Sequence, residues 1–390
     1  MRRSCTSDPL RAASVALALL AAGGVGGAPT LAAQRYWRSS FFPYVYYRTT
    51  DGFTVAAHYG LNSPLGFVER PEPNRAAVNL DAGAGTAGTW FFVADAHAPV
   101  WWDGWRARLT VAATRLNRLG YYGVGNDTHY SSDSANLGAY YYRVSRTRLA
   151  LRATVQRRLL GPLRLLAGGA LVHTDFRALP GANVYKTDLA NGTVDSGTVP
   201  FTDGAARIGI VLDTRDNEVD PRTGVFLDAV YASGTGYTRT TAHARAFVRP
   251  VRPLVLAGRL AVEDMGGHPP LAAVGEMEAS ELPFVAVGGY RSLRGYYEGR
   301  FTGPGKLIGG LEARYEVWAV GDALQVKLVA FYDAGRVFDP GEAVRLTTTG
   351  LHKSGGGEIA VRVLRNALIV AGYAHGADGG RGLLGLGWSY

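Results

Sequence analysis

Alternation of apolar and polar side chains with a period of two is the feature that most constrains this 390-residue sequence. Between residues 148 and 156, leucine, alanine and valine fill one set of alternate positions, while arginine, threonine and glutamine dominate the other. Successive side chains of a strand point to opposite faces, so this pattern predicts a strand with one apolar and one polar face. Such segments lie near residues 41–48, 53–59, 75–85, 88–98, 105–118, 137–159, 163–178, 205–215, 225–236, 238–250, 254–267, 306–319, 324–338, 351–364, 367–374 and 382–390. We therefore predict an all-β chain of about 16 antiparallel strands, an even number as bacterial outer-membrane barrels require.

A barrel in a membrane explains the alternation better than a soluble sheet sandwich, although alternation alone is compatible with both. Aromatic residues cluster at predicted strand ends, in 101–105 and 140–142, as they do at the interfaces of outer-membrane barrels. The last segment, 382–390, alternates toward Trp388 and Tyr390, which predicts a lipid-facing strand that ends on an interfacial anchor. Hydrocarbon cannot satisfy the open edge of a sheet, so a sheet in lipid must close on itself. We therefore predict a transmembrane antiparallel β-barrel with its basic residues mainly in the lumen.

Residues 1–33 have the pattern of a signal peptide. Arginines precede an apolar run at 12–22, and a small-residue cleavage site ends at Ala33. The alternative is an uncleaved membrane anchor, but the apolar run is short for a spanning helix. The single cysteine, Cys5, lies inside this segment. We predict a mature barrel of residues 34–390 in the outer membrane of a Gram-negative-type envelope, with both termini periplasmic and outer-membrane lipid around it.

The sequence argues against nucleic-acid binding, metal binding and catalysis. The formal net charge is +9, but no run of five or more Lys or Arg occurs, so no nucleic-acid partner is expected. The eight histidines lack the spacing of metal ligands, and the acids of 213–220 are typical of a turn in which short side chains cap backbone donors. No Gly-x-Ser-x-Gly elbow is present. We predict no catalytic residue, metal or cofactor; a lipid hydrolase with Ser and His brought together across strands is an alternative that the sequence leaves open.

A long segment between two predicted strands, Gly267–Gly305, is rich in proline, glycine and charge and is predicted to be one loop. Loops of this length inside a compact domain are usually functional or disordered. This one carries many apolar and aromatic residues, so we expect it to pack against the interior of the barrel. Near its middle, Arg294 and Gly295 form a tight turn that would present a guanidinium group.

Two carboxylates on the strands that follow are the predicted partners of Arg294. Glu312 and Asp333 both lie on the polar face of their strands, so both would point into the lumen. Adjacent strands lie about 4.8 Å apart, so one planar guanidinium could bridge the two. The alternatives are that Arg291 or Arg300 fills this place, or that the loop lies outside. In the second case Glu312 would pair with Arg314 or Lys327.

Five short motifs in a fixed order resemble those of one family. They are Tyr121–Thr128, Asp213–Asn217 with Pro221–Gly224, Leu293–Tyr296, Gly310–Glu312 and Phe331–Gly335. The chain resembles the barrel domain of the Omp85 superfamily, the bacterial surface antigen group that includes outer-membrane assembly factors and two-partner secretion transporters. The resemblance implies that the loop-six tip consists of Leu293, Arg294, Gly295 and Tyr296. It also implies that Arg294 meets Glu312 and Asp333, and that Gly335 ends the second strand motif.

The resemblance implies assembly, insertion or translocation of proteins, or of lipids, at the outer membrane. Family members normally carry periplasmic POTRA modules before the barrel. The stretch between residue 34 and the first predicted strand is too short for one. We therefore expect a periplasmic module-bearing partner to recruit clients, which would include unfolded outer-membrane proteins. The alternatives are a passive pore and a structural, surface-exposed barrel.

The seam between the first and last strands is expected to pair poorly. Pro43 in the first strand has no amide hydrogen for a ladder, and Gly385 and Gly387 put no side chains on the inner face of the last. We predict a short or distorted pairing between residues 41–50 and 382–390.

Overall fold

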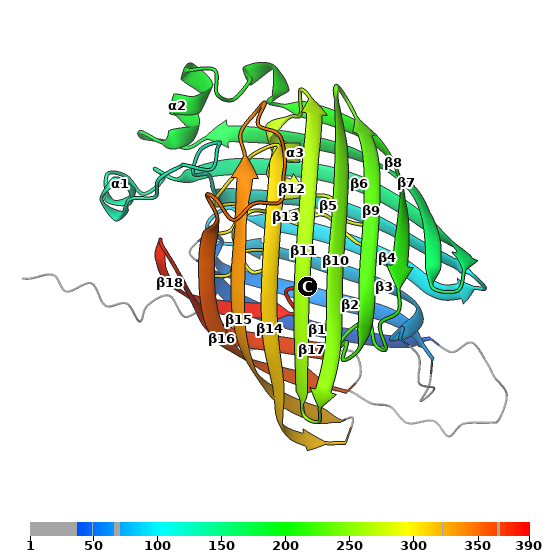
Figure 1. Ribbon diagram of the computed structural model, residues 1–390. Helices are drawn as coiled ribbons and strands as arrows, with labels where there is room; N and C mark the ends of the chain where they lie inside the picture. Colours follow the sequence, from blue (N-terminus) through cyan, green and yellow to red (C-terminus); the bar gives the residue numbers. More distant parts are fainter. Residues whose placement is uncertain (1–36, 49, 66–70, 322, 365–366) are drawn as a thin grey trace, which may run out of the picture.

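The computed structural model describes residues 37–390 apart from 49, 66–70, 322 and 365–366, so the predicted signal peptide, 1–33, lies outside this part. Within it, 16 strands form one antiparallel sheet in which each strand pairs with its neighbour in the chain. The strands are β1 (Arg38–Arg48), β2 (Gly52–Pro64), β3 (Asn74–Gly85), β4 (Trp90–Trp102), β5 (Trp105–Gly120), β6 (Arg143–Leu160), β7 (Leu163–Ala178), β8 (Phe201–Asp213), β9 (Gly224–Gly234), β10 (Tyr237–Val251), β11 (Leu254–Gly267), β14 (Gly305–Val320), β15 (Leu324–Phe338), β16 (His352–Val363), β17 (Ala367–Gly376) and β18 (Gly379–Leu386). Figure 1 shows this sheet curled round on itself. The predicted all-β fold and strand count are confirmed.

The two faces of the curled sheet differ as the alternation predicted. On β14, Leu311 is 66% exposed and Tyr315 is 49% exposed, whereas Glu312 and Arg314 between them are buried. An apolar outer face and a charged inner face reverse the arrangement of a soluble protein. They fit a sheet whose outer face meets lipid.

The two ends of the barrel are built differently. Two-residue turns join β4 to β5 and β10 to β11 at one end, while long connections lie at the other. The long connections carry the short helices α1 (Ser132–Asn136), α2 (Val184–Ala190) and η2 (Ser196–Thr198), and α1 and α2 are seen at one end in Figure 1. No helix in the described part of the chain is long and apolar enough to cross a membrane. Trp102 and Trp105 are exposed at the short-turn end, as predicted for an interfacial girdle.

The long loop between β11 and β14, residues 268–304, folds into the barrel. It contains helix α3 (Leu271–Val274) and a two-stranded piece made of β12 (Glu276–Met277) and β13 (Phe284–Val285). Its apolar residues are buried against the inner wall in a cluster made up of Ala261, Met277, Ala286, Val287, Leu293, Tyr296, Phe301, Ile308 and Val337. The inward-folded loop expected from its apolar content is confirmed.

The tyrosines of 140–142 do not form the expected girdle. They lie in the turn before β6, and Tyr142 is buried. Its ring packs against those of Tyr122 and Tyr130, and Tyr297 of the long loop joins the same cluster. The prediction was wrong because the segment near 137 belongs to a loop rather than to a strand.

The end of the chain also departs from expectation. Strand β18 ends at Leu386, and Gly387 adopts a φ of 92°, a left-handed conformation that glycine accepts without strain. The chain then turns into the lumen, where Trp388 and Tyr390 are buried instead of facing lipid. The Trp388 Nε1 donates to Asp220 Oδ1 at 3.2 Å, so the predicted lipid anchor is wrong.

The sheet has two ends, β1 and β18, and no ladder joins them among the residues that the structure describes. β18 has 8 residues and β1 has 11. Early termination of β18 at Gly387 shortens the edge that it offers to β1. The short or distorted pairing expected between residues 41–50 and 382–390 stays a prediction.

Candidate functional site

Arg294 lies at the tip of the long loop, on the inner wall of the barrel. Its Nε and Nη2 donate to the two oxygens of Asp333 at 2.8 and 2.9 Å, and its Nη1 donates to Glu312 Oε1 at 2.6 Å. Glu358 Oε2 lies 3.4 Å from the same Nη1. The structure therefore places Arg294 on both carboxylates singled out in the sequence, and adds a third. We call these four residues the Arg294 cluster.

The register of β14, β15 and β16 explains how the three carboxylates meet. Asp333 is opposite Gly310 on one side and Ser354 on the other, so Glu312 and Glu358 lie one or two inward positions along the neighbouring strands. The guanidinium carbon of Arg294 lies 3.5 Å from the centre of the Phe331 ring. The planar group thus stacks on an aromatic face while its edges reach the carboxylates, a geometry that lysine cannot reproduce.

Two glycines let the loop tip reach the wall. A Cβ built on Gly335 would lie 2.7 Å from Leu293 Cδ1, and one on Gly295 would lie 2.6 Å from the Cβ of Ser354. Any larger residue at either place would push the tip away from β15 and β16. Tyr296, which follows, donates its hydroxyl hydrogen to the Lys353 carbonyl at 3.3 Å.

Of the alternatives considered for the cluster, Arg291, Arg300 and Lys327 have other places in the structure, whereas Arg314 contacts Glu312. Arg300 donates to Asp378 Oδ2 at 2.6 Å, and Lys327 donates to Asp220. Arg291 lines a separate cavity. Arg314 does contact Glu312, with Nε 2.7 Å from Oε2, so Glu312 serves two arginines at once.

Sequence reasoning did not pick out Glu358 or the acids of the loop itself. Glu358 has the inward parity of its strand, and this was the signal that could have revealed it. In the loop, Glu278 accepts from Arg152 at 3.1 Å and also from Arg207, while Glu276 pairs with Arg148 on β6. Together they form a second anchor, opposite the Arg294 cluster.

The carboxylate of Glu276 is strongly favoured in its charged form. Burial alone would raise its pKa, but Arg148, followed by Arg146 and Arg152, outweighs burial and lowers the pKa to about 2. The pKa of Glu281 is lowered as well, because Arg245 and Arg215 outweigh its burial. These buried carboxylates stay charged because arginines lie beside them, so the loss of an arginine would leave an unpaired charge inside the barrel.

Two further sequence motifs hold local structure, and the first of them contacts the long loop. Gly125 pairs with Thr302 at the base of the loop, and both terminal nitrogens of Arg300 donate to Thr128. In the turn after β8, Asp216 Oδ1 accepts from the backbone nitrogens of Arg222 and Thr223. Asp216 therefore caps backbone donors, as predicted from the sequence. The prediction is wrong for Asp220, which accepts from the side chains of Lys327 and Trp388 instead.

Comparisons with known proteins agree with this architecture. A model of the Omp85 superfamily domain matches residues 77–363, which is more than half of the chain. The structure is similar to that of BamA from Haemophilus ducreyi lacking POTRA domains 1-3, with a TM-score of 0.55, 11% identity, and coverage of 90% of this chain and 69% of that one. It is also similar to CdiB from Escherichia coli, with a TM-score of 0.55, 11% identity, and coverage of 92% and 61%. A search among curated proteins gave no match.

The fold and the inward-folded loop define an outer-membrane β-barrel of the kind that encloses its own plug. The chain belongs to the Omp85 superfamily. Its place is the outer membrane of a Gram-negative-type envelope. Barrels of this family are transporters and assembly factors rather than enzymes.

Proposed function

We propose that this barrel assembles, inserts or translocates proteins, or moves lipids, at the seam between β1 and β18. The observation that carries the proposal is an asymmetry. The Arg294 cluster and the Glu276 and Glu278 pairs fasten the loop to β6, β8 and β14–β16, whereas no ladder joins β1 to β18 in the described part of the chain. The seam can therefore widen while the loop keeps its anchors.

The loop also argues against the passive pore. Its apolar side chains pack on the inner wall with exposures near zero, and its Arg294, Glu276 and Glu278 are paired with wall residues. Such a plug lowers the resting conductance of the barrel. In planar bilayers we expect small, rare openings, whereas a general pore would conduct steadily.

Recruitment of clients is assigned to a partner protein that carries periplasmic modules. Its support is that this chain matches only 69% of the similar BamA chain and 61% of the similar CdiB chain, so part of each has no counterpart here. Crosslinking in intact outer membranes, followed by identification of the attached protein, tests this assignment. A module-bearing periplasmic protein on the short-turn end is the expected product, and its absence would leave the barrel to act alone.

Disulfide locking tests the seam itself. A cysteine at Val45 on β1 is combined in turn with cysteines along β18, and each pair is oxidised in cells that depend on the barrel. The only native cysteine is Cys5, in the predicted signal peptide. The matched control joins Val45 to Val55, its partner in the existing β1–β2 ladder. We expect a seam lock to abolish function until reductant is added and the control lock to be harmless; full activity of a seam-locked barrel would indicate a pore or a structural barrel.

A further inference from the structure

The connection between β8 and β9 is longer than its neighbours at the same end of the barrel. Residues 214–223 join these two strands, whereas two-residue turns join β6 to β7 and β10 to β11. The connection has a defined shape, because Asn217 Oδ1 accepts from the backbone nitrogens of Val219 at 2.8 Å and of Asp220 at 2.9 Å. A turn of this length can reach beyond the barrel wall. We call residues 214–223 the strap.

One side of the strap contacts the first strands of the barrel. The backbone nitrogen of Glu218 donates to the carbonyl oxygen of Pro71, just before β3, at 2.8 Å. Arg106 on β5 donates from Nη2 to Glu72 Oε1 at 2.7 Å, and the same nitrogen donates to Glu218 Oε1. One guanidinium nitrogen therefore ties the strap to the residues that lead into β3. We call Arg106, Glu72 and Glu218 the Arg106 clasp.

The other side of the strap contacts the opposite wall. Asp220 accepts from Lys327 Nζ on β15 at 2.6 Å, and Arg362 Nη1 on β16 lies 3.7 Å from the same carboxylate. In the order of the 16 strands β5 is the fifth and β15 the thirteenth, so they stand half-way round the curled sheet from each other. The strap therefore crosses the mouth of the barrel at the short-turn end.

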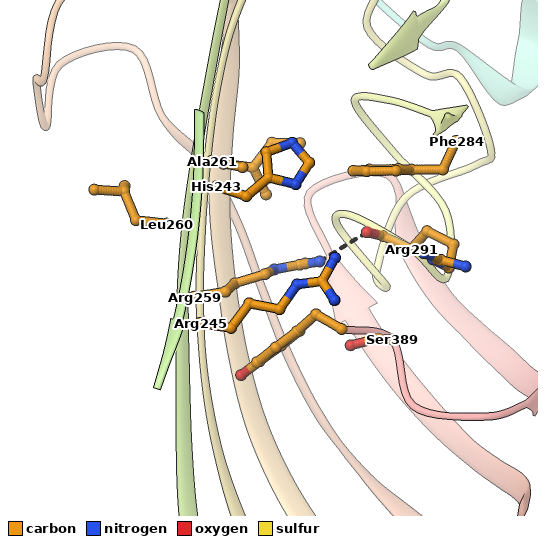
Figure 2. A pocket seen from close by; sticks show the side chains of 10 residues that line it. His243, Arg245, Arg259, Leu260, Ala261, Phe284, Arg291 and Ser389 are labelled. Carbon is orange, nitrogen blue, oxygen red and sulfur yellow. Dashed lines mark hydrogen bonds between the residues drawn. The ribbon is translucent and has the colours of Figure 1, made fainter. Parts of the chain in front are cut away.

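The chain end fills the part of this mouth next to β10 and β11. Ser389 faces the same small cavity as Arg245 and Arg259 of the wall, as Figure 2 shows. The Tyr390 hydroxyl donates to the carbonyl oxygen of Ala257 on β11 at 3.3 Å. Toward β3 and β5, the strap itself closes the mouth, and the Arg106 clasp holds it there.

The two sides of the strap are held with different strength. The side chains of Asp220 and Lys327 are 1% and 4% exposed, whereas those of Glu218 and Arg106 are 17% and 18% exposed. In the clasp, two carboxylates also share one donor nitrogen and repel each other. An ion pair that water reaches is broken at lower cost than a buried one. The clasp is therefore the side that releases first.

Solvent reaches the inner wall beyond the clasp. The inward side chains of Asp81 on β3, His97 on β4 and Arg108 on β5 are 31%, 28% and 33% exposed. We propose that the strap is a hinged gate that pivots on Asp220, opens at the Arg106 clasp and connects this solvent with the short-turn end. The inference depends on neither the seam nor a client protein.

A cysteine pair tests the gate, because it removes the clasp when reduced and replaces it when oxidised. Glu72→Cys combined with Glu218→Cys removes both carboxylates, and the hydrogen bond between the backbones of residues 71 and 218 brings the two cysteines close enough to join. In planar bilayers, the reduced variant should be open about tenfold more of the time than the wild type, the change expected for the loss of one charge-assisted hydrogen bond. Oxidation should return the open time to the wild-type level or below.

Asp103→Asn is the matched control, because it breaks an exposed ion pair with Arg158 at the same end of the barrel. Its open time should equal that of the wild type. Protease cleavage within residues 285–300 reports on the long loop, and it should stay at the wild-type level in the reduced cysteine variant. Arg106→Gln breaks the clasp from its other side and replaces the cysteine pair if that pair fails to give a folded, heat-modifiable band.

Equal open times for the reduced variant and the wild type would overturn the gate. An increase that persists after oxidation would do the same, because the strap would then not be the part that moves. An increase accompanied by cleavage of the long loop would assign the openings to the loop instead. Failure of the two cysteines to oxidise in the folded barrel would contradict the contact between the strap and residues 71–72.

Discussion

The two halves of the barrel wall are held in different ways. In β1–β5, inward side-chain pairs join neighbouring strands, through a hydrogen bond between His58 and Asp81 at 2.8 Å and an ion pair between Arg108 and Asp95 at 2.8 Å. In β6–β16, inward charges reach across the lumen to the long loop, as in the Arg294 cluster. The first half is a curved sheet that depends on its own ladders, and the second half is braced from inside.

This difference indicates which half moves more easily. Breaking a buried, hydrogen-bonded ion pair costs several times more than breaking a partly exposed one. The braced half therefore resists deformation, and the seam lies where bracing ends on the β1 side. Substitutions in the braced half should therefore destabilise the protein more than those in the first half. Only the former should increase protease cleavage of the long loop.

The largest effect is expected from Arg294→Ala. It removes one arginine from three buried carboxylates, a change that typically costs about 3–5 kcal/mol. The loop should detach, and protease cleavage within residues 285–300 should increase while the barrel still runs as a folded, heat-modifiable band. Arg294→Lys keeps the charge but loses the planar fork and should show an intermediate effect. Wild-type protease resistance and full activity in the alanine variant would contradict the anchoring role.

The second anchor should fail as the pH falls. The pKa of Glu276 is about 2, below its usual 4.5, so its contribution is fully present above about pH 4.5 and is lost toward pH 2. Cleavage of the loop by an acid-active protease should therefore increase between pH 4.5 and 2. Glu276→Gln should show increased cleavage already at neutral pH and a weaker dependence on pH. Identical pH profiles for the variant and the wild type would rule out this residue as the cause.

A smaller effect is expected at the end of the chain. Trp388→Phe removes the hydrogen bond to buried Asp220 and weakens the contact with Arg314, whose guanidinium lies 3.8 Å from the indole centre. Loss of one such bond costs about 1–3 kcal/mol, so the unfolding midpoint should fall modestly. If the residue faced lipid instead, the change from Trp to Phe would leave that midpoint unaltered.

The smallest effect is expected from Asp81→Asn in the first half. The His58 and Asp81 side chains are 19% and 31% exposed, and a pair of this kind contributes about 0–1 kcal/mol. Protease cleavage within residues 285–300 should equal that of the wild type. Detachment of the loop in this variant would show that the two halves are coupled rather than distinct.

Much of this arrangement could be predicted from the sequence because strand periodicity assigns faces. Once Glu312 and Asp333 are assigned to the inner face, the spacing of strands brings them together, and a turn such as Arg294–Gly295 supplies the cation. Glu358 follows the same parity rule on the next strand. The alternation was sufficient for these three carboxylates because the regular pairing of neighbouring strands determines which residues lie side by side.

The remaining features, the inward turn of the chain end and the contacts of the loops, depend on backbone conformation. The alternation of apolar and polar residues carries no information about it. The alternation continues through Trp388, so only the left-handed Gly387 distinguishes an inward turn from a longer strand. The pairs made by Glu276 and Glu278 depend on how an irregular loop folds, and no periodicity governs that. The burial of Tyr142 arises in the same way, from contacts between two loops.

Hydrogen–deuterium exchange on the barrel in lipid tests the central claim most directly. If the loop braces β14–β16 and leaves the seam unladdered, the amides of β1 and β18 should exchange much faster than those of β14 and β15. In Arg294→Ala, exchange in the loop and in β14–β16 should accelerate while that of β1 stays the same. Equal, slow exchange in β1, β18 and β15 of the wild type would contradict the account, because it would mean that the seam is as firmly paired as the braced wall.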